Sequence, residues 1–398
     1  MSQAFLKAIV VVAGLALCIF IIIQFVQLPG RMGQLDFRGY WSASYLLAQS
    51  QDFGDDDLIR QVQREQTDYD RDYAVKTWNL PWILVWFLPY TFVNFFEASR
   101  LWFFTNILML QASILGSWHI VRQTASSQNK RGWVWPLLTA ILFPSTLVSL
   151  LFGQVNIIVL GGMVGFLYFY QRAQDVKAGI ALALVTLKPH LVYLALPIIL
   201  LQLWRERRWR VFAAAAGIIL ASTAVLFLLR PTFLSDYLAT FGEGNLLRWE
   251  TATLTTYLSI KFNWPWIRLI GILLLPLTTL IWWHWRSRIS FSYALQIAIF
   301  LSIITVPFGW SYDFVLLLFP LTQMWGWLLG GLRTRWETAL VIIALSITFR
   351  IIYWQRVQTP SELYFFWIPL VIATLYTYTA YRRLPEKVAV TQDVGPDF

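Results

Sequence analysis

The chain has 398 residues, of which 58% are hydrophobic and only 13% are charged, and its mean hydropathy is +0.58. A water-soluble domain cannot bury that much apolar surface, so the composition excludes a soluble enzyme. The net charge of +10 does not indicate nucleic-acid binding, because the basic residues are dispersed over many short segments rather than gathered on one folded domain. We therefore expect a lipid bilayer, and no nucleic acid, as a partner.

Long apolar stretches recur along the chain, each long enough or nearly long enough to cross a hydrocarbon core of about 30 Å. The first, Phe5 to Val26, is too long for a secretory signal and lacks a small-residue cleavage site, so we interpret it as a retained helix. Further candidates lie at about 80–96, 101–121, 133–152, 155–170, 178–203, 211–229, 266–285, 290–306, 312–332, 337–353 and 363–381. The sequence therefore predicts an all-α, polytopic integral membrane protein of about 12 transmembrane helices.

Basic residues between the later spans predict the orientation of the chain, because such residues accumulate on the cytoplasmic side. Four clusters, each two spans apart, mark that side: Arg205 to Arg210, Arg286 with Arg288, Arg333 with Arg335, and Arg382 to Lys387. Loops 27–79, 230–264, 306–311 and 354–362 are then expected outside if an even number of spans precedes residue 205. Arg122, Lys130 and Arg131 break the rule if every candidate crosses, so we expect an exception at the Lys188-Pro189-His190 break or at 80–96.

We expect one transmembrane domain over 1–385, followed by a disordered cytoplasmic tail at 386–398. Two exterior loops are long, 28–79 and 230–264. The apolar spacing of the first predicts short amphipathic helices along the membrane surface. Its Asp55-Asp56-Asp57 run is open to two interpretations, a metal site or a helix N-terminus; we prefer the second, and expect no metal or cofactor.

Asp36 stands just beyond the first apolar stretch, in Gln34-Leu35-Asp36-Phe37-Arg38-Gly39-Tyr40-Trp41. A carboxylate at the water edge of a bilayer can act as a base on a substrate that arrives from the aqueous side. Capping of a helix that begins at Phe37 is an equally good local interpretation. Asp36 is therefore the first catalytic candidate, with a structural alternative.

Five short motifs with polar residues occur in the following order along the chain. They are Asp36 with Tyr40-Trp41, Asn79-Leu80-Pro81, Gly153-Gln154-Val155-Asn156, Leu187-Lys188-Pro189, and Pro307-Phe308-Gly309-Trp310-Ser311-Tyr312-Asp313. In this order the chain resembles glycosyltransferase family 87, the polyprenol-phosphate-sugar-dependent enzymes of the GT-C superfamily, over residues 5 to about 325. Leu80 stands where the family usually has a first proline, and Pro307-Phe308-Gly309 where serine and proline are commoner.

The resemblance implies a GT-C fold and an inverting hexosyltransferase of the cell membrane, with its active site on the exterior face. Asp36 would be the general base on an acceptor hydroxyl, and the donor a polyprenyl-phosphate sugar. Mannose is the sugar expected by analogy with relatives, and a glycolipid or glycan the expected acceptor. A lipid-linked donor has its phosphate at the interface, so a base near that plane can be aligned with it.

The leaving phosphate gains negative charge, so nearby cations and hydrogen-bond donors would lower the barrier. A lysine at the centre of an apolar helix costs on the order of 2.5–3.5 kcal/mol, which favours a function for Lys188. The expected phosphate ligands are Lys188, His190 and Arg248, and the expected substrate contacts are Arg38, Tyr40, Trp41, Asn79, Gln154, Asn156, Tyr312 and Asp313.

These residues also have structural alternatives. Lys188 could snorkel or pair with a buried carboxylate, Gln154 and Asn156 could bond between helices, and Asp313 could cap a helix or pair with a cation.

A transporter or flippase is the alternative function. Transporters often show paired repeats with interrupted helices, whereas this chain has no clear internal repeat and its polar motifs lie at the expected exterior edges. A ligase that transfers preassembled glycans would need a strongly cationic exterior cavity, and the longest exterior loop is net acidic. Both comparisons favour the glycosyltransferase.

Overall fold

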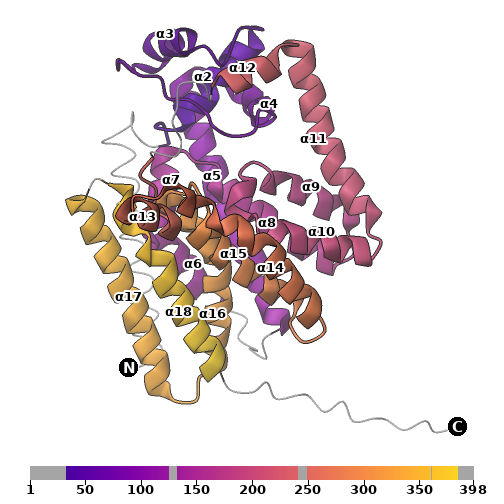
Figure 1. Cartoon of the computed structure of the whole chain (residues 1–398), viewed down its shortest axis with the longest axis vertical. Coiled ribbons are helices and arrows are strands. Elements are labelled where there is room, and N and C mark those ends of the chain that lie inside the picture. The colour runs from indigo at the N-terminus through magenta and orange to yellow at the C-terminus, as the bar shows by residue number, and fades with distance from the viewer. Residues whose placement is uncertain (1–32, 125–131, 241–248, 360, 384–398) are drawn as a thin grey trace, which may run out of the picture.

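A computed structural model describes residues 33–124, 132–240, 249–359 and 361–383 (Figure 1). Over these ranges every regular element is a helix, and the β structure is limited to one isolated bridge between Leu332 and Arg383. The all-α prediction is therefore confirmed. The expected first span, Phe5 to Val26, and the tail at 386–398 lie outside the described residues, as does Arg248.

A small group of helices, here called the cap, lies at one end of the molecule and comprises residues 33–92 and 230–240 (Figure 1). It contains α2 (Phe37–Ala48), α3 (Asp56–Thr67), α4 (Ile83–Phe87), η1 (Leu88–Phe92) and α12 (Phe233–Ala239). Two long helices, α5 (Phe95–Thr124) and α11 (Trp209–Leu229), run between the cap and the rest.

The remaining helices form the bundle. They are α6 (Val134–Leu142), α7 (Pro144–Phe152), α8 (Asn156–Gln171), α9 (Asp175–Val185), η2 (Pro189–Val192), α10 (Ala195–Arg205), α13 (Leu254–Lys261), η4 (Pro265–Leu269), α14 (Ile270–Trp285), α15 (Phe291–Thr305), η5 (Ser311–Leu317), α16 (Leu318–Gly330), α17 (Arg335–Gln358), η6 (Glu362–Phe365) and α18 (Trp367–Arg382). The bundle holds most of the apolar stretches that the sequence predicted as spans.

Among the described residues, six helices are long and apolar enough to cross a membrane, and the pair α6 and α7, bent by 60°, makes up to seven. The expected count of about 12 is not confirmed. The candidate at 80–96 folds as two short pieces, α4 and η1, with Pro89 in the first turn of the second. A proline lacks the backbone N–H that a continuous helix needs, so the apolar stretch is split.

The candidate at 178–203 is a hairpin rather than one helix. Pro189 excludes Lys188 from helical geometry, and Lys188 has φ −139° and ψ 69°. The outer ends of α9 and α10 meet, because Arg208, just after α10, pairs with Asp175 at the start of α9. The chain therefore turns back at Lys188, which removes one of the crossings that had placed Arg122 on the wrong side.

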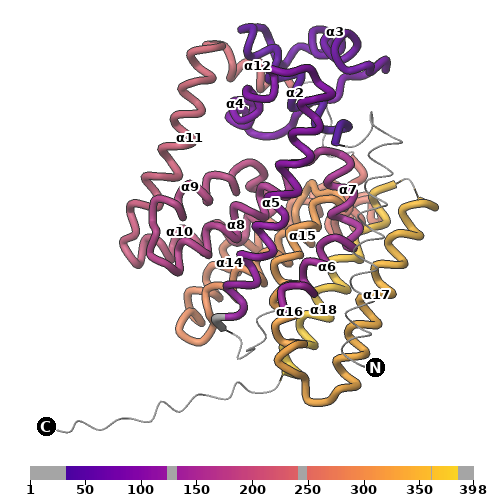
Figure 2. The backbone as a smooth tube through the Cα atoms, turned by 180° about the vertical axis from the view of Figure 1, so that it is seen from behind, coloured from indigo at the N-terminus to yellow at the C-terminus, as the bar shows by residue number. Residues whose placement is uncertain are grey.

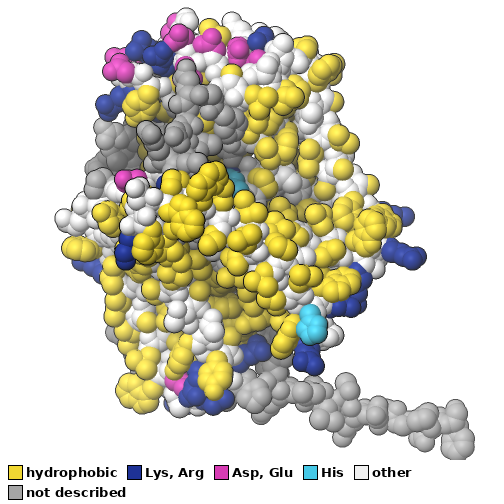
Figure 3. Space-filling view, viewed as in Figure 1, with side chains coloured by type: hydrophobic (Ala, Val, Ile, Leu, Met, Phe, Trp, Pro, Cys, Tyr) yellow, Lys and Arg dark blue, Asp and Glu magenta, His cyan; other side chains and the backbone are white. Residues whose placement is uncertain are grey.

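Several basic residues lie at the end of the bundle that is far from the cap. Arg172 at the end of α8 contacts His119 near the end of α5, and Arg382 at the end of α18 pairs with Glu337 near the start of α17. Figure 2 shows that α5 runs from the cap to this far end. Figure 3 shows Lys and Arg side chains along the lower rim and most acidic side chains over the cap. This far end of the bundle is called the basic end below.

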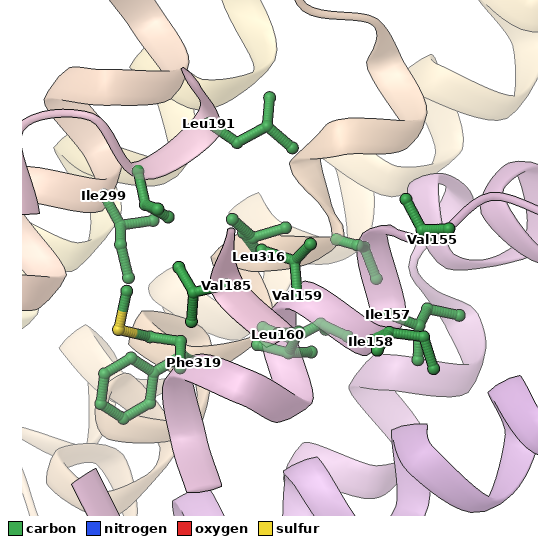
Figure 4. Packing of buried hydrophobic residues seen from close by; sticks show 14 of the residues in the cluster. Val155, Ile157, Ile158, Val159, Leu160, Val185, Leu191, Ile299, Leu316 and Phe319 are labelled. Carbon is green, nitrogen blue, oxygen red and sulfur yellow. The ribbon is translucent and has the colours of Figure 1, made fainter. Parts of the chain in front are cut away.

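The core beneath the cap joins α8, the hairpin and η5. Val159 and Leu160 of α8 lie close to Val185 of α9, to Leu316 of η5 and to Phe319 of α16 (Figure 4). These side chains are at most 1% exposed. This packing fixes the relative positions of the breaks before α8, after α9 and before η5. The polar motifs lie at those breaks.

Gly153 ends α7 in a left-handed conformation, with φ +70°. The segment before α2 crosses it closely: the Gly33 N–H donates to the Leu151 carbonyl at 2.9 Å, and the Asp36 N–H donates to the Phe152 carbonyl at 2.8 Å. A Cβ on Gly153 would lie 2.5 Å from the Gly33 carbonyl oxygen. Only glycine allows both the backbone conformation and the contact.

Gly153→Ala is expected to lower the thermal midpoint of the detergent-solubilised protein, because the left-handed conformation alone costs about 1–2 kcal/mol for a residue with a Cβ. The control is Gly217→Ala on α11, where an added Cβ meets nothing within 4 Å. That change should be neutral or stabilising by about 0.5–1 kcal/mol. Equal midpoints for the two variants would contradict the packing described here.

Candidate active site

A cavity of about 790 Å³ lies between the cap and the bundle. Its wall combines several aromatic side chains with cations and carboxylates. The lining includes Asp36, Arg38, Tyr40, Lys76, Trp78, Asn79, Gln154, Lys188, His190, Trp249, Glu250, Trp310, Tyr312, Arg356 and Glu362. The size suits one sugar with a neighbouring phosphate or hydroxyl group.

Asp36 precedes α2, and its side chain makes no capping hydrogen bond to that helix. The N-cap interpretation of this carboxylate is therefore not supported. Instead Gln154 Nε2 donates to Asp36 Oδ2. Burial raises the pKa of Asp36 to about 6 from 3.8, although the hydrogen bond from Gln154 and the charge of Lys188 act in the opposite direction. The carboxyl group is thus poised to exchange a proton near neutral pH.

Gln154 connects Asp36 to the hairpin. Its Oε1 accepts hydrogen bonds from Lys188 Nζ at 2.8 Å and from the Tyr40 hydroxyl at 3.1 Å. The amide therefore has one fixed orientation, with its NH₂ group directed at the carboxylate. Asn79 holds the hairpin from the cap side, because its Nδ2 donates to the Leu187 carbonyl at 2.9 Å.

Lys188 forms a buried ion pair with Asp313, at 3.0 Å between Nζ and Oδ1, and the two side chains are 6% and 1% exposed. The other carboxylate oxygen of Asp313 accepts the Trp310 backbone N–H at 2.8 Å. Both structural alternatives for Asp313, a helix cap and a cation partner, therefore hold. Lys188 Nζ also lies 5.1 Å from the centre of the Tyr312 ring, which lines the cavity.

The structure gathers most of the predicted residues at this cavity, with exceptions. Arg38 lines it but donates from Nε to the Thr67 hydroxyl at 2.8 Å, which ties α2 to the end of α3. Trp41 is 1% exposed, does not line the cavity and donates to the Tyr90 carbonyl at 3.0 Å. Asn156, fully buried at the start of α8, and Asp313, which is 1% exposed, do not line it either.

Five charged residues that line the cavity were not among the predicted site residues: Arg71, Lys76, Glu250, Arg356 and Glu362. Arg356 near the end of α17 pairs with Glu362 at 2.6 Å and also contacts the Ser311 hydroxyl. The second oxygen of Glu362 accepts the Ser311 N–H at 2.8 Å. The sequence did hold one signal for Arg356 and Glu362: both lie in the loop 354–362, which the basic clusters placed on the same side of the membrane as Asp36.

The acidic run at the start of α3 has structural partners. The Asp55 carboxylate accepts the Asp57 and Leu58 backbone N–H groups and so caps α3, as the preferred interpretation predicted. Asp56 pairs with Lys76, and Asp57 pairs with Arg60.

A family model for glycosyltransferase family 87 matches residues 80–307. No curated protein and no solved structure matches the chain significantly. The match covers more than half of the chain and includes Gln154, Lys188 and His190 at the cavity, whereas Asp36 precedes it and Asp313 follows it. The chain therefore belongs to glycosyltransferase family 87 and is a membrane glycosyltransferase.

Proposed function

We propose that the protein transfers a hexose from a polyprenyl-phosphate donor to an acceptor hydroxyl, with inversion and with Asp36 as general base. Asp36 takes the hydroxyl proton, the acceptor oxygen bonds to the anomeric carbon, and the bond from that carbon to the phosphate oxygen breaks. The lipid phosphate leaves with the electron pair. Mannose is the proposed sugar, by analogy with the family, and the acceptor is a glycolipid or glycan on the exterior face of the membrane.

The position of Asp36 carries the proposal. Its carboxylate lines the cavity. Among the described residues, the side chain of Gln154 donates a hydrogen bond to it, at Oδ2. The other oxygen, Oδ1, is then available for a substrate hydroxyl. A base needs this combination of a fixed orientation and a pKa near the working pH.

Asp36→Asn is expected to lower transfer by about 10²–10⁴-fold, because the amide cannot accept the proton. The assay uses purified protein, polyprenyl-phosphate mannose or related donors, and candidate acceptors, with the thermal midpoint as a check on folding. The control is Asp70→Asn in the cap, whose side chain is 92% exposed. Near-normal turnover of a folded Asp36→Asn protein would reject the base assignment. Substrate flux in liposomes without transfer by the wild type would favour the transporter instead.

The pH profile tests the same carboxylate. Since the base works only when ionised, kcat/KM should be constant above about pH 6 and fall about tenfold per unit below it. Gln154→Leu removes a hydrogen bond that lowers the pKa of Asp36, so the acid limb should move to higher pH. An unchanged limb in this variant would mean that another group titrates.

Arg356 is a stronger candidate than Lys188 for a direct contact with the donor phosphate. The ammonium group of Lys188 is shared between Gln154 and Asp313, and its side chain is only 6% exposed. Arg356 has a side chain that is 27% exposed at the cavity. Glu362 and Ser311 accept two of its N–H groups, so terminal N–H groups remain for two phosphate oxygens.

Arg356→Gln is expected to raise the KM for the donor about tenfold or more, because a hydrogen bond to a charged group contributes about 1.5–3 kcal/mol. Inhibition by free polyprenyl phosphate should weaken in parallel. Arg350→Gln is the matched control, since Arg350 is an exposed arginine of the same helix that does not line the cavity. Unchanged donor KM and product inhibition in folded Arg356→Gln would exclude the contact.

A further inference from the structure

A second hollow, of about 610 Å³, lies between α5, α8 and α9 and shares no residue with the cavity described above. It is called the α5/α9 groove here. Its lining is mostly apolar and small: Met109, Ala112, Ser113, Leu115, Gly116, His119, Gly161, Val164, Gly165, Tyr168, Phe169, Lys177, Ile180, Ala181 and Leu184. The three helices lie side by side in the view of Figure 2.

The groove is long and narrow. On α5 it runs from Met109 to His119, which is about 15 Å at 1.5 Å per residue. The glycines of α8 let the walls approach closely, since a Cβ on Gly161 would meet Met109 Sδ at 2.3 Å and one on Gly165 would meet the Ala181 Cβ at 3.2 Å. A slot of these dimensions on an apolar surface suits a single hydrocarbon chain.

The two ends of the groove differ in charge. Met109, Gly161 and Leu184 line one end, whereas His119, Tyr168 and Lys177 line the other, at the basic end of the bundle. Beside this second end, the Arg172 guanidinium lies 3.5 Å from the centre of the Tyr168 ring and contacts His119.

The carboxylate nearest to these cations in sequence, Asp175, is paired with Arg208. Arg122 follows His119 by one turn of α5, and its side chain is exposed. The second end of the groove therefore carries an excess of positive charge.

We propose that the α5/α9 groove binds an anionic phospholipid, with one acyl chain in the slot and the phosphate against Lys177 and Arg172. Basic pockets between transmembrane helices are suited to acidic head groups. The basic clusters predict this end to be cytoplasmic, where acidic lipids attract such residues. A lipid bound here would stabilise the position of α9, the helix of the hairpin that precedes Lys188.

The test compares phospholipids that share acyl chains and differ in head group. Delipidated protein in non-ionic detergent is titrated with phosphatidylglycerol or phosphatidylcholine while the thermal midpoint is followed. Phosphatidylglycerol should raise the midpoint by on the order of a few degrees more than phosphatidylcholine. Equal shifts for the two lipids would overturn head-group recognition.

Two pairs of variants locate the effect. The double variant Lys177→Gln, Arg172→Gln should lose the preference for phosphatidylglycerol. The control Lys261→Gln should keep it, because Lys261 is an exposed lysine that also lies near an aromatic ring but is not part of the groove lining. Ala112→Trp should fill the slot and reduce binding of both lipids, whereas Leu108→Trp, on an exposed face of the same helix outside the lining, should not. A full phosphatidylglycerol effect in the Ala112→Trp protein would place the lipid elsewhere.

Discussion

The buried ion pair between Lys188 and Asp313 is the constraint on which the site depends. Leaving either charge alone in this interior would cost about 3–5 kcal/mol, so the two residues are held together although 125 positions separate them in sequence. The pair fixes the tip of the α9–α10 hairpin against η5. Gln154 is then oriented by Lys188 and Tyr40, and Asp36 by Gln154. The position of the proposed base therefore follows from contacts among four separate segments.

All four residues of this network lie where regular helix is interrupted. Asp36 precedes α2, Gln154 separates α7 from α8, Lys188 precedes η2, and Asp313 belongs to the 3-10 helix η5. Interrupted helices leave backbone groups that need partners, and at membrane depth they persist only inside protein or beside water. Here side chains supply some of those partners, as Asn79 does for the Leu187 carbonyl and Asp313 for the Trp310 N–H. The breaks create the cavity wall and supply its polar groups together.

The sequence predicted the helical class, and most of the predicted site residues line the cavity, because both leave local signals. Apolar stretches reveal helices, and a charged residue such as Lys188 inside one of them indicates a special environment. Hydropathy could not distinguish a crossing from the hairpin at Pro189 or from the short pieces α4 and η1, because short helices such as Ile83–Phe92 and Ala195–Arg205 are apolar as well.

The failures at individual residues have a different cause. Trp41 and Asn156 neighbour cavity residues in sequence but point into the protein, since consecutive helical residues face different directions. Arg356 and Glu362 were missed because their partner, Ser311, is about 50 positions away and the pairing exists only after the bundle forms.

The burial of the hairpin tip explains why the charges there must be neutralised. The side chains of Lys188 and Asp313 are 6% and 1% exposed, and an isolated ammonium group in such an interior is expensive. Asp313 offsets that cost, and Gln154 accepts a second hydrogen bond from the same ammonium group. Lys188 can therefore lie at the cavity as a cation, where its charge favours the ionised form of the Asp36 carboxyl group and opposes the effect of burial on the pKa of Asp36.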